Sequence, residues 1–337
     1  MLLLGVLPLL CGGPALAQSL TSDVPGMTAA LAGSTAPSDF APDRSYAMFG
    51  APSPAQFVTL GSLRVWDSAF ASRSELAGDP RTGTQHVAAS VAGTAIGADT
   101  QFPDNSLLGL SFSLSRQTFS SGPGHGDSND LTLTGYGRYN FLQHAYLVGA
   151  LGYGWHNIST IRFVPGFSSI DLTAHYQAQD VGGRLEGGYS FAPDDSDVLS
   201  PYAALVGDAF HQPAYQEKGQ SIFAAAFSPR TLGITHMELG GRYAGLFRLG
   251  GGSLSIDAMA AWEYELDDDP YVLAAFQTAP DTKFPVYGTR PAKDTALIGT
   301  GLRYQAGQSV SLGLRGDARL GSGTTIYSGT ADITYRW

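Results

Sequence analysis

Few residues of this chain combine a type and a spacing that could support chemistry. Ser128 is a possible nucleophile in a Gly/Pro/His-rich segment, and seven histidines could act as bases or metal ligands. A nucleophilic serine needs a base within hydrogen-bond reach and donors for an oxyanion. The sequence identifies neither around Ser128. We therefore predict no catalytic residue and no enzyme activity.

The triplet Gly126-Asp127-Ser128 resembles the start of a GDS-type esterase block. It departs from that block at the next position, where Asn129 replaces the usual leucine. The segment has the composition of a loop. We therefore expect an ordinary exposed loop at this position.

Metal chemistry is also weakly supported. His125, His175 and His211 fall at or near predicted outer loops, but no HxH or HxxxH spacing joins any histidines. Zinc needs three or four protein ligands in fixed geometry. The acidic run 267–269 could bind calcium weakly, but calcium takes about six to eight oxygens. We predict no metal and no cofactor.

Charged residues on the polar faces of alternating runs are the better functional candidates. Their mixed signs would let them pair across a wet interior and keep it hydrated. Such a lining would suit passage of a polar segment, or it would only solvate and pack the interior, and both interpretations stay open. The predicted lumen-lining residues are Arg138, Arg184, Glu186, Glu238, Arg242, Asp257, Glu263, Arg303, Arg315, Asp317, Arg319, Asp332 and Arg336.

The elements that must position these side chains are strands. Apolar and polar residues alternate with a period of two, as in a strand with one wet face. The run 201–211 is less regular, because Asp208 falls in register with Tyr202, Ala204 and Val206; we place Asp208 near the outer rim and leave its facing open. The twelve alternating runs are 63–72, 86–99, 107–118, 130–141, 145–158, 174–191, 201–211, 232–247, 253–266, 295–305, 308–320 and 325–337.

The final run shows the alternation most clearly. Trp337, Tyr335 and Ile333 form an apolar face, and Arg336 and Thr334 lie on the other. A free aromatic strand would promote aggregation in water. It is suited to a barrel wall with lipid on one side.

Composition agrees with a membrane barrel. Only 14% of the 337 residues are charged, against about a quarter in soluble proteins. Beyond the N-terminus no stretch approaches the ~20 apolar residues of a spanning helix, and a membrane protein without such helices must be a closed barrel. The net charge of −10 argues against nucleic acid as a partner. We predict an all-β, 12-stranded antiparallel transmembrane barrel of the outer membrane, present as a monomer in lipid.

Connections and aromatic residues support this prediction. The even-numbered connections between successive runs are short, and the odd-numbered ones tend to be longer. The ninth connection (267–294) is the longest. Short periplasmic turns that alternate with longer outer loops are typical of outer-membrane barrels. Aromatic residues near strand ends would form the interfacial girdles: Trp66, Tyr139, Phe141, Trp155, Tyr243, Trp262, Tyr264, Tyr304 and Trp337.

The N-terminus differs from the rest. Residues 1–17 have an apolar stretch followed by Ala15-Leu16-Ala17, which predicts a secretory signal peptide. The only cysteine, Cys11, lies within it. Residues 18–61 are rich in Ala, Ser, Thr and Pro and carry no sustained period, so we predict a linker, short passenger or lumen plug. The barrel domain would span 62–337.

The chain resembles the C-terminal translocator barrel of autotransporters (type V secretion). The residues that carry the resemblance are Val65-Trp66, the segments 95–99, 108–112, 201–205 and 296–302, and the terminal tryptophan. The resemblance implies a twelve-stranded barrel in a Gram-negative outer membrane that exports an N-terminal passenger. It also implies a lumen-threading segment, periplasmic chaperones and the barrel assembly machinery as partners, with Trp337, Tyr335 and Ile333 as assembly signal.

One departure concerns the passenger. About forty residues separate Gln18 from Leu60, which is too few for a stalk or an enzyme domain, so we expect either a barrel without a passenger or a start site placed too late. No asparagine lies in this segment, so we also expect no asparagine-type self-cleavage there. The alternatives are a passive channel or porin and an adhesin-like barrel that binds through its outer loops.

Overall fold

The computed structural model describes residues 62–337 except 105, 123, 142–143, 165–170, 194–195, 250, 268–269, 308 and 337. The predicted signal peptide (1–17), the segment 18–61 and Trp337 therefore lie outside the described residues. Among the residues that are described, no helix is long and apolar enough to cross a membrane.

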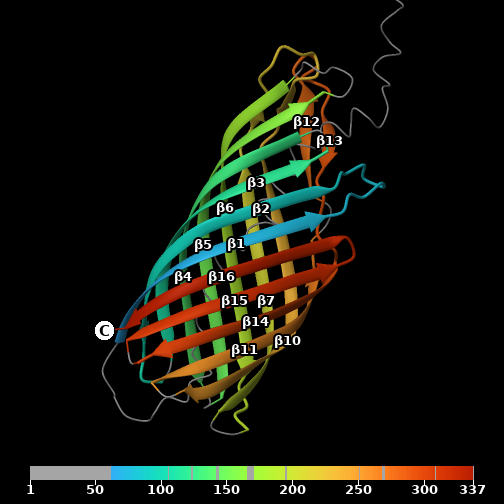
Figure 1. The fold of residues 1–337 in the computed structure, drawn as a ribbon. Coiled ribbons are helices and arrows are strands. Elements are labelled where there is room, and N and C mark those ends of the chain that lie inside the picture. Colours follow the sequence, from blue (N-terminus) through green and yellow to red (C-terminus); the bar gives the residue numbers. More distant parts are fainter. Residues whose placement is uncertain are drawn as a thin grey trace, which may run out of the picture.

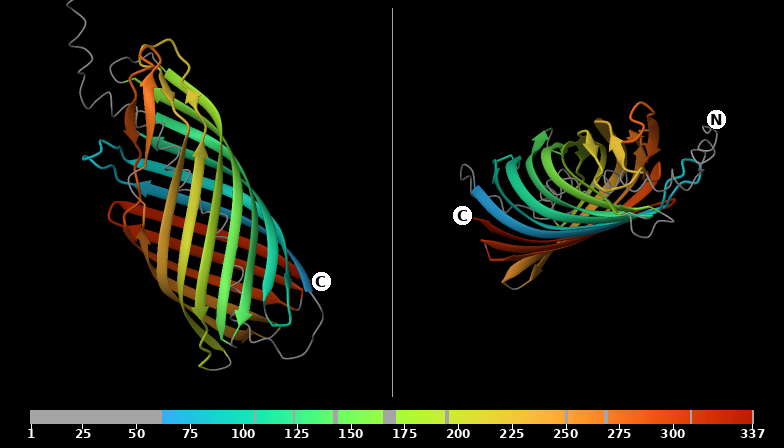
Figure 2. Two further views of the ribbon diagram at one scale, coloured as in Figure 1. Left: turned by 180° about the vertical axis from the view of Figure 1, so that it is seen from behind. Right: turned by 90° about the horizontal axis from the view of Figure 1, so that it is seen from above.

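Twelve antiparallel strands form a closed barrel, as predicted (Figures 1 and 2). Each strand pairs with its neighbour in chain order, and β16 closes the barrel by pairing with β1 from Val65↔Tyr335 to Leu76↔Thr324. The barrel strands are β1 (Ser62–Leu76), β2 (Val87–Gln101), β3 (Leu107–Ser121), β4 (Gly124–Phe141), β5 (Ala145–Phe163), β6 (Asp171–Tyr189), β7 (Asp197–Gln212), β10 (Arg230–Leu249), β11 (Gly252–Glu265), β14 (Asp294–Ala306), β15 (Val310–Gly321) and β16 (Thr324–Arg336).

The barrel has an apolar outer wall and a packed interior. On β5, Tyr146 and Val148 are buried inside, whereas Leu147 and Leu151 face outward and are exposed. A tilted strand needs only about 9–11 residues to cross a membrane. Strands of up to 20 residues therefore extend beyond it. The extended end carries the longer odd-numbered connections and is the extracellular one.

Four short strands in the seventh and ninth connections form a second sheet, which we name the lid. They are β8 (Tyr215–Gln216), β9 (Ala225–Phe227), β12 (Tyr271–Phe276) and β13 (Phe284–Tyr287), in the order β13-β12-β9-β8. β12 and β13 lie at the end of the barrel away from the C-terminus (Figure 1). The sequence analysis assigned these residues to loops, because strands of two to six residues are too short to establish a period.

The prediction of a long third connection was wrong. Only two residues separate β3 from β4, and the first of them, Gly122, has a φ of 50°. Ser128 lies within β4, His175 within β6 and His211 within β7, not in loops. Above the membrane both faces of a strand can be polar, so the alternation that marks the membrane-spanning part is lost there.

The prediction of Trp66 as a girdle residue was also wrong. Its side chain is 2% exposed and faces the lumen. Gly97 makes room for it, since a Cβ on that glycine would lie 2.4 Å from the indole ring. The indole nitrogen donates to the Tyr136 hydroxyl at 2.8 Å, so the position is determined by an interior hydrogen bond that periodicity does not reveal.

Run 201–211 corresponds to β7, and the structure resolves its facing. Tyr202, Ala204 and Val206 are buried inside the barrel, and Leu205 is exposed on the outer wall. Asp208 also points inward, because a Cβ on Gly182 would lie 2.0 Å from its carboxylate oxygen. Here the apolar residues fill the lumen, which explains why Asp208 shares their register.

Candidate functional site: the lumen and its lid

A four-residue ion-pair network joins β6 and β10 along the inner wall, over the intervening β7. Arg184 donates to both carboxylate oxygens of Glu238 at 2.8 and 2.7 Å, and to Glu186 at 2.8 Å. Arg242 donates to both oxygens of Glu186 at 2.6 and 3.0 Å. Glu186 and Glu238 are almost completely buried. Two-point arginine–carboxylate contacts of this kind are the geometrically best ion pairs.

Tyrosines on flanking strands complete this network. The Tyr146 hydroxyl donates to Glu186 at 3.1 Å, and the Arg242 guanidinium lies 3.6 Å from the centre of the Tyr202 ring. Arg138 lies over the Tyr146 ring at 4.1 Å and donates to Asn140 at 2.7 Å. The interior of β4–β10 is therefore filled by charges that are held by one another and by aromatic rings.

The adjoining part of the wall, from β11 to β16, carries a second series of ion pairs. Arg319 on β15 donates to both oxygens of Glu263 at 2.6 and 2.8 Å. Arg303 donates to both oxygens of Asp332 at 2.9 Å. Positive and negative side chains alternate around the lumen, so the lining is polar without a large local excess of either sign.

Arg315 links two carboxylates of this wall. It donates to Asp257 at 2.7 Å and to Asp317 at 2.8 Å. These residues come from β11 and β15. Of the residues predicted to line the lumen, only Arg336 has no described side chain; its backbone pairs with Arg64.

Three short inward aspartates of this part of the wall each lie against a glycine on the next strand. A Cβ on Gly299 would lie 2.1 Å from the Asp317 carboxylate, and a Cβ on Gly301 would lie 2.3 Å from the Asp257 carboxylate. Gly313 has the same relation to Asp332 at 2.2 Å. These glycines allow the carboxylates to lie flat along the wall. A Gly opposite an Asp in adjacent runs is a signal that the sequence analysis missed.

A further ionic cluster was not predicted. Asp99 accepts from Arg64 at 2.6 Å and from the Tyr136 hydroxyl at 3.0 Å. Farther along the lumen, His156 is hydrogen-bonded through its two ring nitrogens to Asp130 at 2.8 Å and Asp180 at 2.7 Å. Sequence reasoning missed these residues because their partners are 24 to 37 residues away in the chain.

The candidate nucleophile lacks the geometry for catalysis. Ser128 is buried, and its hydroxyl donates to Asp130 rather than to a histidine. His175 and His211 face outward and are hydrogen-bonded to Ser159 at 2.9 Å and Thr231 at 3.0 Å. The three histidines considered from the sequence thus lie on separate strands and do not surround Ser128.

One group of residues has the donor types of a metal site. His236, Glu238 and Glu263 place one ligand atom each within 4.8 Å of one another. Both carboxylates already accept two hydrogen bonds from an arginine, Arg184 or Arg319. A cation here would have to compete with two charges that are already in place.

The lid packs into the extracellular end of the lumen. One hydrophobic cluster joins lid residues Tyr215, Phe227 and Val272 to inward residues of the barrel wall such as Phe119 and Phe210. The Tyr215 ring stacks between Tyr176 of β6, at 4.2 Å, and Phe227, at 4.6 Å. The lid and the wall therefore share one apolar core across the mouth of the barrel.

A buried ion pair fastens the lid to the wall. Arg162 of β5 donates to Glu217 at 2.7 Å, and both side chains are 1% exposed. Glu217 also accepts from the backbone of Ala225 at 2.7 Å. Beside it, Thr173 and Lys218 exchange two backbone hydrogen bonds of 2.9 and 2.7 Å. Removal of either partner of such a buried pair leaves a charge without compensation.

With this geometry in place, the comparisons with known proteins identify the family. The family model for the autotransporter beta-domain matches residues 65–317. The chain belongs to the autotransporter β-domain family. It is an outer-membrane translocator barrel of the kind found in Gram-negative bacteria. The comparison with curated proteins found no match.

Solved structures of autotransporter barrels share the fold. The translocator domain of NalP from Neisseria meningitidis is 17% identical, with a TM-score of 0.69 over 91% of this chain and 99% of that one. The beta domain of the Bordetella autotransporter BrkA is 18% identical, with a TM-score of 0.60 over 81% and 98%. The transport unit of AIDA-I from Escherichia coli is 13% identical, with a TM-score of 0.53 over 88% and 98%.

Proposed function

We propose that residues 18–61 thread the lumen of this autotransporter barrel and that the barrel carries the N-terminal part of the chain through the lid to the cell surface. The mechanism is physical rather than catalytic. The observation that supports it most is the lumen itself, in which paired charges line a closed wall and an apolar lid occupies the extracellular mouth.

The paired charges suit passage of a polypeptide. An arginine that is already bonded to a carboxylate on both sides, such as Arg184, has little tendency to retain a passing charge. The less buried charges of the second series, such as Asp257 and Arg319, are 25% and 24% exposed and can still bind water, so a polar chain does not lose hydration throughout its path. On this proposal the predicted lumen residues provide a hydrated but weakly binding surface.

The lid must move for export to occur. Its core fills the mouth with apolar side chains, and a folded core has no space for a second chain. The lid therefore opens while the chain passes and closes afterward, with Arg162 and Glu217 as the contact that re-forms. The closed lid keeps the barrel tight once export is complete.

The conductance of the purified barrel tests the lumen-threading proposal. Deletion of residues 18–60 should raise the conductance of the channel openings that occur in planar bilayers when the lid is displaced, because the deletion removes the segment that occupies the pore. The matched control replaces the same residues by a Gly/Ser segment of equal length, which should restore a low conductance. A steady conductance that is equal with and without residues 18–60 would instead favour a passive channel.

Assembly gives a second prediction. We propose that the outward residues Ile333 and Tyr335, 48% and 43% exposed, act with Trp337 as the signal read by periplasmic chaperones and the barrel assembly machinery. Replacing Tyr335 and Trp337 by alanine should leave only a minor fraction of the chain inserted, as measured by heat-modifiable gel migration. The control is Tyr304→Ala, an outward aromatic on β14. Equal insertion of the wild-type protein, the double variant and the Tyr304→Ala control would refute the signal.

A further inference from the structure

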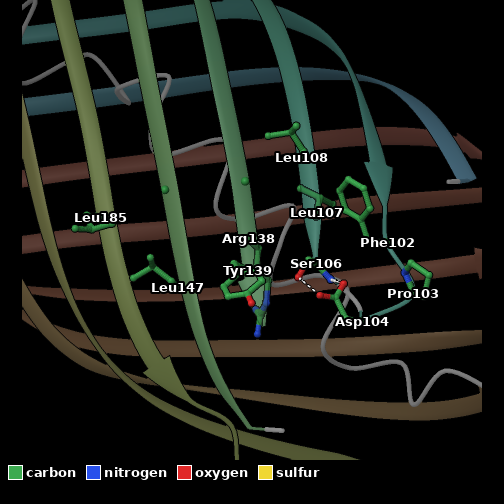
Figure 3. Close-up of a pocket in the computed structure, with 12 residues that line it drawn as sticks. Phe102, Pro103, Asp104, Ser106, Leu107, Leu108, Arg138, Tyr139, Leu147 and Leu185 are labelled. Atoms are coloured by element: carbon green, nitrogen blue, oxygen red, sulfur yellow. Dashed lines mark hydrogen bonds between the residues drawn. The ribbon is translucent and has the colours of Figure 1, made fainter. Parts of the chain in front are cut away.

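The outer wall carries an apolar groove at its periplasmic end, over β3 to β6 (Figure 3). One row across these four strands reads Leu108, Gly137, Gly149 and Leu185, as the strand pairing places them opposite one another. Neighbouring strands lie about 4.8 Å apart, so two leucines flank a trough that is two strands wide. Tyr139 and Leu147 of the next row close it toward the periplasm.

Of the two glycines in this trough, Gly137 is explained by its backbone neighbour, since a Cβ there would lie 3.1 Å from the Leu107 carbonyl oxygen, whereas Gly149 has no internal explanation. The lumen-facing Gly97 and Gly109 are crowded by the rings of Trp66 and Tyr136, which a Cβ would meet at 2.4 and 2.5 Å. By contrast, a Cβ on Gly149 would have nothing within 4 Å. Glycine weakens a strand interior and often marks a site where another molecule approaches closely. The trough at Gly149 therefore leaves room for an occupant outside the protein.

The periplasmic rim of the groove carries a negative charge. Asp104, in the turn between β2 and β3, is exposed, and its two carboxylate oxygens accept from the Ser106 backbone nitrogen at 3.0 Å and the Ser106 hydroxyl at 2.9 Å. In Figure 3 the carboxylate lies beside Ser106 at the end of the groove. These hydrogen bonds fix the orientation of the carboxylate at the rim.

We propose that this groove binds one phospholipid whose headgroup carries an ammonium group. An acyl chain lies in the glycine trough between Leu108 and Leu185, and the ammonium group meets the Asp104 carboxylate. The occupant is a lipid because the outer wall of a membrane barrel is in contact with lipid. The ammonium headgroup follows from Asp104, the exposed charge at the rim, because Arg138 of the same lining is buried and donates to Asn140. This site is independent of the route taken by residues 18–61.

Native mass spectrometry of the full chain, titrated with phosphatidylethanolamine or phosphatidylglycerol micelles, tests the proposal. The wild-type barrel should retain one phosphatidylethanolamine, preferred over phosphatidylglycerol by roughly two- to fivefold, the factor for a partly exposed ion pair. Asp104→Asn should abolish the preference and keep the acyl chain. Gly149→Leu should lower retention of both lipids.

Gly241→Leu is the matched control, since Gly241 on β10 also has open space around an added Cβ, and it should leave retention unchanged. Folding of each variant is checked by heat-modifiable migration. Equal retention of the two lipids by the wild-type barrel would overturn the headgroup assignment. Retention by the Gly149→Leu variant equal to that of the Gly241→Leu control would overturn the groove. The Asp104→Asn comparison keeps the headgroup assignment testable if the Gly149 variant does not fold.

Discussion

A disulfide between positions 173 and 218 is expected to block export while leaving the barrel assembled. Thr173 of β6 and Lys218 of the lid exchange two backbone hydrogen bonds. In such an antiparallel pair the Cα atoms lie about 5.5 Å apart, which is within the range of disulfides. The bond would hold the lid against the wall at the point where the proposed opening has to separate them. An epitope placed after Gln18 should then stay inside the cell envelope.

The experiment compares Thr173→Cys/Lys218→Cys with Asn157→Cys/Gln177→Cys. The second pair joins β5 to β6 on the outer wall and does not involve the lid. The only native cysteine is Cys11, within the predicted signal peptide. Pulse-labelled cells are treated with an alkylating agent and then with protease, with or without prior reductant.

Reductant should restore surface exposure of the epitope in the lid variant, and the control pair should export in either condition. The lid proposal fails if chains in which the 173–218 disulfide has already formed still bring the epitope to the surface at the wild-type rate.

The second large effect is expected from Arg184→Met, which should destabilise the barrel by about 3–5 kcal/mol, the cost of removing one partner of a buried ion pair. The change leaves Glu238 buried without the arginine that donates to both of its oxygens. Glu186 keeps Arg242, so the loss is concentrated on Glu238. Urea-dependent unfolding in detergent micelles measures the free energy.

Two variants make this result interpretable. Arg73→Met removes an arginine that is paired with Glu75 on the outer wall, and its side chain is 64% exposed; an exposed pair contributes at most about 1 kcal/mol. The double variant Arg184→Met/Glu238→Met should recover part of the lost stability, because no buried charge is left alone. An Arg184→Met barrel as stable as Arg73→Met would show that the network does not support the wall.

The twelve strands could be predicted because lipid on one side and water on the other impose a strict period of two. That condition holds in β11, where Trp262 faces outward and Glu263 inward. It fails in β4 near His125 and Ser128, which lie above the membrane, so loop-like composition concealed a strand. It fails again at Trp66 and Tyr202, where the lumen is filled with rings instead of water.

The ion-pair partners and the lid could not be predicted from the sequence, for a different reason. Arg162 and Glu217 are 55 residues apart, and nothing in either local sequence specifies the other. The lid strands β8 and β9 have two and three residues, and they exist only because two loops pair with each other over the apolar core. Alternation predicts which charges face inward, whereas pairing depends on the closed barrel.

Protease treatment of intact cells that carry an epitope after Gln18 tests the central claim most directly. If the barrel exports its N-terminal segment through the lumen, added protease should remove the epitope from intact cells while the barrel remains and keeps its heat-modifiable migration. An epitope that stays protected in intact cells, and is cut only after the outer membrane is permeabilised, would contradict export.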